Sequence, residues 1–186
     1  LSDLVAEVRE QVLVDAVIAG MPEGDRLEVG GFEAQAYADA IATYLAFAVS
    51  KLSNNCSSLT SWMNDRGAFR ETFSRQALPM LWDFAEANPL GDFGGAFTFC
   101  LKKGSEMLKK IVGECEGLVD QASALARNYS GYVVSTDPPY YDNIGYSDLS
   151  DYFYVWLRRC LQDIHPDVVG TMLTPKADEL VANPYR

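Results

Sequence analysis

The feature that most constrains this chain is the pair Pro138-Pro139, which follows the β-branched segment 131–136 (GYVVST). Proline has no amide hydrogen and fixes its own φ, so two prolines in a row cannot continue a β-ladder. We therefore predict a strand over 131–136 that ends before Asp137. A stiff, carbonyl-rich loop must follow, with an acid at its start and the aromatic ring of Tyr140 at its end.

The first two thirds of the chain have helical periodicity. Apolar residues recur every three or four positions over 2–19 and over 33–52, which predicts two amphipathic helices. A third helix is predicted over 72–87, kinked or divided at Pro79. A fourth is predicted over 96–115.

Around the proline loop the pattern becomes that of an α/β fold. Residues 117–120 predict a second short strand, and a helix is predicted to begin at Ser147 or Asp148. Helix, strand, loop and helix in this order are typical of a sheet whose ligands bind at the carboxyl ends of the strands. We therefore predict an α/β chain, with a mainly helical region over 1–116 and a partial catalytic segment over 117–186.

Two strands do not make a stable parallel sheet. Either further strands lie within the region predicted as helical, or the rest of the sheet lies on residues outside this sequence. The chain opens without a methionine and closes without a terminating signal. We therefore expect an excised piece of a larger protein.

Composition narrows the classes of function. The longest apolar stretch, 41–49, is too short to cross a bilayer, and no charged-then-apolar leader opens the chain, so a cytoplasmic protein without membrane contact is predicted. The only histidine, His165, precedes Pro166, which favours a helix-end residue over a catalyst. Scattered cysteines without a Cys-x-x-Cys pair favour free buried thiols over a zinc site or a disulfide framework: Cys56, Cys100, Cys115 and Cys160.

Net charge argues against one class of partner. The chain carries 26 acidic residues against 15 Lys and Arg, a net charge of −11. Because binding to a phosphate backbone requires a basic surface, this chain does not have the composition of a domain that binds nucleic acid by electrostatic attraction. The best local exception is a group of three arginines in a region with few acids: Arg66, Arg70 and Arg75.

The run Asp137-Pro138-Pro139-Tyr140 offers a specific chemistry. The exocyclic amine of a nucleobase is a poor nucleophile because its lone pair is delocalised into the ring. The Asp137 carboxylate and the Pro138 carbonyl, held rigid by Pro139, could accept hydrogen bonds from both N–H groups and localise that lone pair. The ring of Tyr140 offers a face on which a base taken out of its helix could stack.

These residues resemble a known family. The four-residue motif is similar to the catalytic motif of amino-methyltransferases that use S-adenosylmethionine, chiefly DNA adenine methyltransferases. The longer run 135–159 (STDPPYYDNIGYSDLSDYFYVWLRR) resembles one subgroup, the large bacterial and archaeal DNA methylases with an N-terminal domain of unknown function. Segments 37–47 (YADAIATYLAF) and 72–89 (TFSRQALPMLWDFAEANP) are similar to the middle region of that subgroup.

The resemblance implies a seven-stranded Rossmann-like sheet, S-adenosylmethionine as methyl donor and DNA as partner. It implies that Asp137, Pro138 and Tyr140 handle the target amine, and that Pro139 fixes the loop. In the subgroup the glycine-rich donor loop lies upstream of this region. The only glycine-rich segment here, 91–95 (GDFGG), is predicted to be a connector. We therefore expect this piece to be inactive alone and leave its cofactor-binding residues unassigned.

Other conspicuous residues have plainer explanations. Helical spacing predicts that Tyr152, Phe153 and Trp156 belong to the core rather than to a base-stacking platform. Segment 82–84 (WDF) is predicted to be core with one solvated acid. The pair Arg158-Arg159 is interpreted as complementing a helix dipole.

Three further residues directly follow the motif. For Tyr141, Asp142 and Asn143, support of the catalytic loop and ordinary loop packing are both open.

Three functions remain open. The first is part of a DNA adenine methyltransferase. The second is a methyltransferase for a protein amide or an RNA base, which the acidic charge favours. The third is a non-enzymatic helical interaction module, in which the proline loop has no catalytic role.

Overall fold

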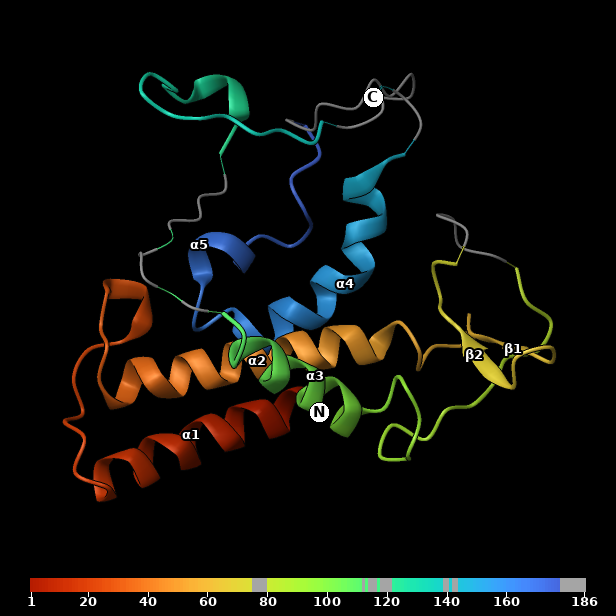
Figure 1. Cartoon of the computed structure of the whole chain (residues 1–186), viewed down its shortest axis with the longest axis horizontal. Coiled ribbons are helices and arrows are strands. Elements are labelled where there is room, and N and C mark those ends of the chain that lie inside the picture. The colour runs from red at the N-terminus through yellow and green to blue at the C-terminus, as the bar shows by residue number, and fades with distance from the viewer. Residues whose placement is uncertain are drawn as a thin grey trace.

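A computed structural model of the chain describes residues 1–74, 80–111, 113, 117, 122–138, 141 and 144–177. The central element is α2 (Ala34–Ser53), which contacts α1 (Ser2–Ile18), α3 (Phe97–Leu108) and α4 (Tyr146–Leu161). Figure 1 shows α1 lying along α2, with α4 rising from the middle of α2 toward the opposite side. The remaining elements are short: η1 (Leu27–Val29), β1 (Ser61–Met63), β2 (Ala68–Arg70), η2 (Ala124–Ala126) and α5 (Pro166–Val169).

Alanines explain how three helices can approach α2. Ala42 and Ala46 have no exposed surface, and four more alanines of this helix are buried. Small side chains let neighbouring backbones come close, and the larger groups of the partner helices fill the space between. The resulting core joins distant parts of the chain: Val5, Ala42, Ala46, Val49, Tyr154, Leu161, Ile164 and Val169.

A buried carboxylate fixes the connection between α1 and α2. Asp39 has no exposed surface, and its Oδ1 accepts a hydrogen bond of 2.6 Å from Arg9 Nε on α1. Its Oδ2 accepts one of 3.2 Å from the Leu27 amide of η1 and lies 3.5 Å from Arg26 Nε. Arg26 also donates to the carbonyl of Asp163, just after α4. One acid thus holds α1, α2 and η1 together and places Arg26 against the end of α4.

The prediction of an α/β fold with a Rossmann-like sheet is wrong. In the described part of the chain the only sheet is an antiparallel pair, in which Ser61 faces Arg70, Trp62 faces Phe69 and Met63 faces Ala68. Segment 131–136 is exposed and forms no strand. No strand of the described ranges pairs with it, so its β-branched residues have no ladder to join there. Of the second predicted strand, 117–120, only Gly117 is described.

Most of the helices predicted from the sequence do form. The predictions over 2–19 and 33–52 are confirmed by α1 and α2, and the predicted start at residue 147 or 148 is confirmed within two residues by α4. The helix predicted over 96–115 is α3, which ends at Leu108.

The helix predicted over 72–87 does not form in its described parts, 72–74 and 80–87. Tertiary hydrogen bonds compete with it at both ends. The amide and hydroxyl of Thr72 each donate to the Asn54 carbonyl at 2.9 Å, just after α2. The Ala85 amide donates to the Thr60 carbonyl at 3.0 Å, and the Thr60 hydroxyl donates to the Ala85 carbonyl at 3.0 Å. These bonds tie the described parts, 72–74 and 80–87, to the residues that follow α2.

None of the helices in the described ranges combines the length and the apolar character that a bilayer crossing requires.

Candidate functional site

The described half of the predicted catalytic motif lies on the surface. Asp137 and Pro138 are exposed, as are all residues of 122–138. In Figure 1 this segment runs along the side of the molecule farthest from α1. Pro139 and Tyr140 lie outside the described residues. The carboxylate and carbonyl predicted to bind an amine are therefore open to a substrate approaching from solvent.

Tyr141 has an uncommon backbone conformation directly after the motif. Its φ is +54°, a value rarely adopted by residues other than glycine, and its side chain is largely exposed. Such conformations cluster at binding and switch sites, where surrounding structure maintains them. Asp142 and Asn143, which were predicted to support or pack the loop, lie outside the described residues.

The helix after the loop is anchored to the body by aromatic residues. The Tyr152 hydroxyl donates to the Ser53 carbonyl at 2.8 Å. The rings of Tyr152 and Phe153 lie 5.2 and 5.3 Å from that of Phe73. Trp156 is partly buried against the main core, whereas Tyr152 and Phe153 are half-buried and pack on Phe73 outside it, so the prediction that all three belong to the core holds only in part.

A polar cluster ties the segment after α5 back to α4. Asp151 accepts hydrogen bonds from the Thr174 amide at 3.0 Å and the Thr174 hydroxyl at 2.6 Å, and it pairs with Lys176. Burial raises the pKa of Asp151, but the hydrogen bonds from Lys176 and Thr174 outweigh burial and hold the pKa below its ordinary value. The helix that follows the motif is therefore held in two ways: by the aromatic contacts of Tyr152 and Phe153, and by the hydrogen bonds of Asp151.

Of the predictions for segment 82–84 and for the pair Arg158-Arg159, the first is wrong and the second is confirmed. Segment 82–84 is not core: Trp82 is 98% exposed and Phe84 44% exposed, because the helix that would have buried them does not form. Arg158 and Arg159 do lie in the last turn of α4, where they complement the helix dipole.

The remaining candidate cations and the histidine lie at unrelated places. Arg66 is exposed in the β1–β2 turn and Arg70 is half-buried on β2, while Arg75 lies outside the described residues. His165 is the N-cap residue of α5, and its Nε2 lies 3.0 Å from the Thr43 hydroxyl. The histidine is thus a residue at a helix end, in contact with α2.

The glycine-rich segment 91–95 is a turn that leads into α3. A Cβ on Gly95 would lie 2.6 Å from Asn55 Cγ, so glycine is needed there for close packing against the residues after α2. No β-strand precedes this turn directly, and the prediction of a connector agrees with this arrangement.

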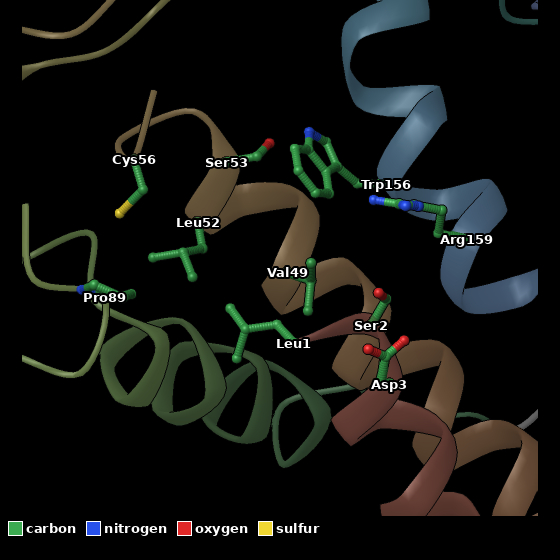
Figure 2. Close-up of a pocket in the computed structure, with 10 residues that line it drawn as sticks. All are labelled: Leu1, Ser2, Asp3, Val49, Leu52, Ser53, Cys56, Pro89, Trp156 and Arg159. Carbon is green, nitrogen blue, oxygen red and sulfur yellow. The ribbon is translucent and has the colours of Figure 1, made fainter. Parts of the chain in front are cut away.

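A cavity of about 370 Å³ opens beside α4, and the described motif residues Asp137 and Pro138 do not line it. Figure 2 shows Trp156 and Arg159 projecting from α4 on one side of it, with Val49 and Leu52 of α2 behind. Its other lining residues are Leu1, Ser2, Asp3, Ser53, Cys56 and Pro89. The sequence analysis missed it because no local motif joins residues from such distant segments.

A second, larger groove of about 690 Å³ lies between α2 and α3. It is open to solvent and lined mostly by apolar side chains, with Lys51 and Lys103 at its edges. The amphipathic pattern of both helices was the signal that could have located it.

Three cysteines have free thiols, as predicted, but they are half-buried rather than buried: Cys56, Cys100 and Cys160. Burial raises the pKa of all three, which keeps them protonated and poorly nucleophilic. Cys115 lies outside the described residues. Within the described part of the chain, no group of His, Cys, Asp and Glu side chains could hold a metal ion.

Comparisons of the chain with protein-family models, with curated proteins and with solved structures find no match.

Proposed function

We propose that this chain carries the amine-binding segment of a methyltransferase that uses S-adenosylmethionine to methylate the exocyclic amine of a DNA base, with adenine as the target. The observation that carries the proposal is the run 135–159, in which the motif Asp-Pro-Pro-Tyr leads directly into an aromatic helix. The exposure of Asp137 and Pro138 supports it, because both acceptors are accessible to a substrate.

The two exposed acceptors have distinct roles in this proposal. One N–H of the target amine donates to the Asp137 carboxylate, and the other donates to the Pro138 carbonyl. Both bonds draw the nitrogen lone pair out of conjugation with the ring and fix its direction. When the methyl group leaves the donor sulfur and bonds to this nitrogen, the two acceptors would stabilise the positive charge that develops there, and the nitrogen would then lose one of its two protons along its hydrogen bond to Asp137.

The residues described do not form a recognisable donor site. S-adenosylmethionine would supply the methyl group, but within the described ranges no strand is followed by a glycine-rich loop. We therefore assign no residue to the donor. The cytoplasmic location expected from the sequence stays a prediction.

The net charge of −11 favours a protein amide over a nucleic acid as the acceptor. A protein amide or an RNA base presents the same pair of N–H donors to Asp137 and Pro138. A protein acceptor also requires no basic surface, which DNA does. The resemblance of the extended run to DNA methylases favours DNA, and the following experiment decides the identity of the acceptor.

The test measures transfer of a labelled methyl group from S-adenosylmethionine by the protein as its gene encodes it. DNA, RNA and a cell protein extract are offered as separate acceptors. We expect label in DNA. Asp137→Ala should lower the rate by about 100- to 1,000-fold, the usual effect of removing one preorganised hydrogen-bond partner. Asp92→Ala, which removes an exposed acid from the turn before α3, is the matched control and should leave the rate unchanged.

Each outcome has a definite meaning. Label in RNA or protein that depends on Asp137 would establish that acceptor and refute DNA. Equal rates for Asp137→Ala and the unaltered protein would remove Asp137 from the chemistry. A protein that labels none of the three acceptors would contradict the proposal as a whole.

A further inference from the structure

The groove between α2 and α3 is an apolar surface without a cover in the described structure. One wall repeats apolar residues of α2 at helical spacing: Ile41, Tyr44, Leu45 and Ala48. The other wall exposes much of three side chains at and just after the end of α3: Met107, at 64%, Leu108, at 40%, and Ile111, at 61%. Exposed apolar surface of this kind marks an interaction site, and a groove with helical spacing along its wall fits the apolar face of a helix.

The charge around this groove has the sign opposite to that of the whole chain. Among the described residues that line it, Lys51 and Lys103 carry charge and none is an acid. Lys102, Lys109 and Lys110 lie exposed on or just after the same helix, so the α3 side holds four lysines within nine residues. Glu71 and Glu106 pair with two of the five lysines at 2.8 and 2.9 Å, but exposed pairs of this kind are weak. The groove therefore fits a helix that is apolar and acidic.

The outward face of α1 has that composition. One side of α1 packs on α2, with Val5 and Ala16 buried. Its opposite side exposes four apolar residues, interspersed with acids: Leu4, Val14, Val17 and Ile18 among Asp3, Glu7, Glu10 and Asp15. A helix that is apolar on both sides normally has a partner on each.

We propose that the α2–α3 groove is a self-association site that receives the outward face of α1 from a second copy of the chain. Apolar surface meets apolar surface, and the acids of one copy meet the lysines of the other. The apolar walls favour a helix over nucleic acid, which would need a polar groove, and the concave shape favours it over a flat lipid surface. This inference is independent of the proposed methyl transfer.

Sedimentation velocity over a range of protein concentrations is the first test. We expect the mean mass to rise with concentration, with a dissociation constant of about 1–100 μM, as befits a small interface. Met107→Glu should weaken association at least about tenfold, because it places a charge on the apolar wall. Met172→Glu, at a methionine that is 74% exposed and lies outside the groove, is the matched control and should associate normally.

Charge reversal identifies the occupant. Lys103→Glu combined with Lys109→Glu should weaken association about three- to tenfold, since each exposed pair contributes little. A chain with Glu7→Lys and Glu10→Lys should be weakened similarly. Mixed together, the two variants should form a complex about as strong as that of the unaltered protein, because each supplies the charge that the other requires.

Three outcomes would overturn the inference. The first is a monomer at every concentration, whether or not the chain then binds a single-stranded oligonucleotide or vesicles containing phosphatidylserine. The second is association that Met107→Glu leaves unchanged, which would move the contact away from the groove. The third is association sensitive to Met107→Glu but without recovery in the charge-reversed mixture, which would exclude α1 as the occupant. Circular dichroism of each variant separates lost association from lost folding.

Discussion

Asp39 shows how much one residue can organise in this chain. A carboxylate removed from water is costly unless ion pairs and hydrogen bonds compensate it. Here Arg9 and the Leu27 amide do so directly, and Arg26 lies within ion-pair distance. Removing the acid would leave two guanidinium groups beside an empty, buried site.

Asp39→Ala should lower the free energy of unfolding by about 3 kcal/mol, at the lower end for a broken buried pair. The lower end applies because the Arg9 side chain is 30% exposed and can be rehydrated. Urea denaturation measures the change. Asp92→Ala, at an exposed acid in the turn before α3, is the control, and a loss for Asp39→Ala as small as that of the control would contradict the assigned role.

Asp151 gives the chain a defined response to acid. Its pKa is raised by burial but lowered further by the hydrogen bonds from Lys176 and Thr174, to a net value below the ordinary 3.8. A carboxylate with a lowered folded-state pKa stabilises the fold above its unfolded pKa. That stabilisation is lost as the pH falls through the folded-state pKa, so the loss occurs below about pH 4.

Lys176→Met should raise the pKa of Asp151 and remove stability that the fold has above about pH 4, so the difference in stability from the unaltered protein should shrink as the pH falls below 4. An NMR titration of the Asp151 carboxyl carbon measures the pKa directly. Lys51→Met, which removes the partner of Glu71, is the matched control and should leave the Asp151 pKa where it is. No movement in the Lys176 variant would mean that Thr174 alone holds the acid.

At the scale of elements, the alanine face of α2 decides how closely its neighbours pack. Ala46→Leu should lower the free energy of unfolding by about 1–3 kcal/mol, because there is no space for three additional carbons without displacing a neighbouring helix. Thermal or urea unfolding measures it. Ala6→Leu, at an exposed position on α1, is the control. Equal stability of the two variants would show that the α2 contacts adjust easily.

The elements that could be predicted from sequence are those whose pattern is local. The stripes of α1, α2 and α4 are read from the spacing of their own apolar residues, and all three form. Residues 72–87 have the same kind of stripe, but the described parts, 72–74 and 80–87, are not helical and make hydrogen bonds with Asn54 and Thr60, which lie near them only in the folded chain. Tertiary partners overrode local preference there.

The β1–β2 hairpin was missed although a signal existed. Its strands have three residues each, which is too few for an alternation of apolar and polar side chains to be recognised in the sequence. Between them lies Asn64-Asp65-Arg66-Gly67, and Gly67 has a φ of +60°, which side chains rarely adopt. A turn sequence ending in glycine between two short apolar stretches indicates a hairpin.

At the scale of the whole molecule, the sheet could not be judged from one strand-like segment. Strand 131–136 was predicted from β-branched residues and a proline stop, but a strand forms only against a partner. The cavity beside Trp156 and the groove beside α3 likewise depend on which segments meet. The motif residues Asp137 and Pro138 could be singled out because their chemistry resides in consecutive positions.

The exposed segment 122–138 has a practical consequence for the continuity of the chain. It connects α3 to α4, while α4 is held to the body by Tyr154 and Leu161 in the shared core and by the Tyr152 hydroxyl. Covalent linkage through this segment is therefore not what keeps α4 in place. A recognition site for a sequence-specific protease, inserted after Tyr132, which is 76% exposed, should be cut and give two fragments on a denaturing gel that still elute together from a gel-filtration column. Fragments that separate would show that the interface is too weak, whereas co-elution would allow the molecule to be produced as two polypeptides that assemble after synthesis.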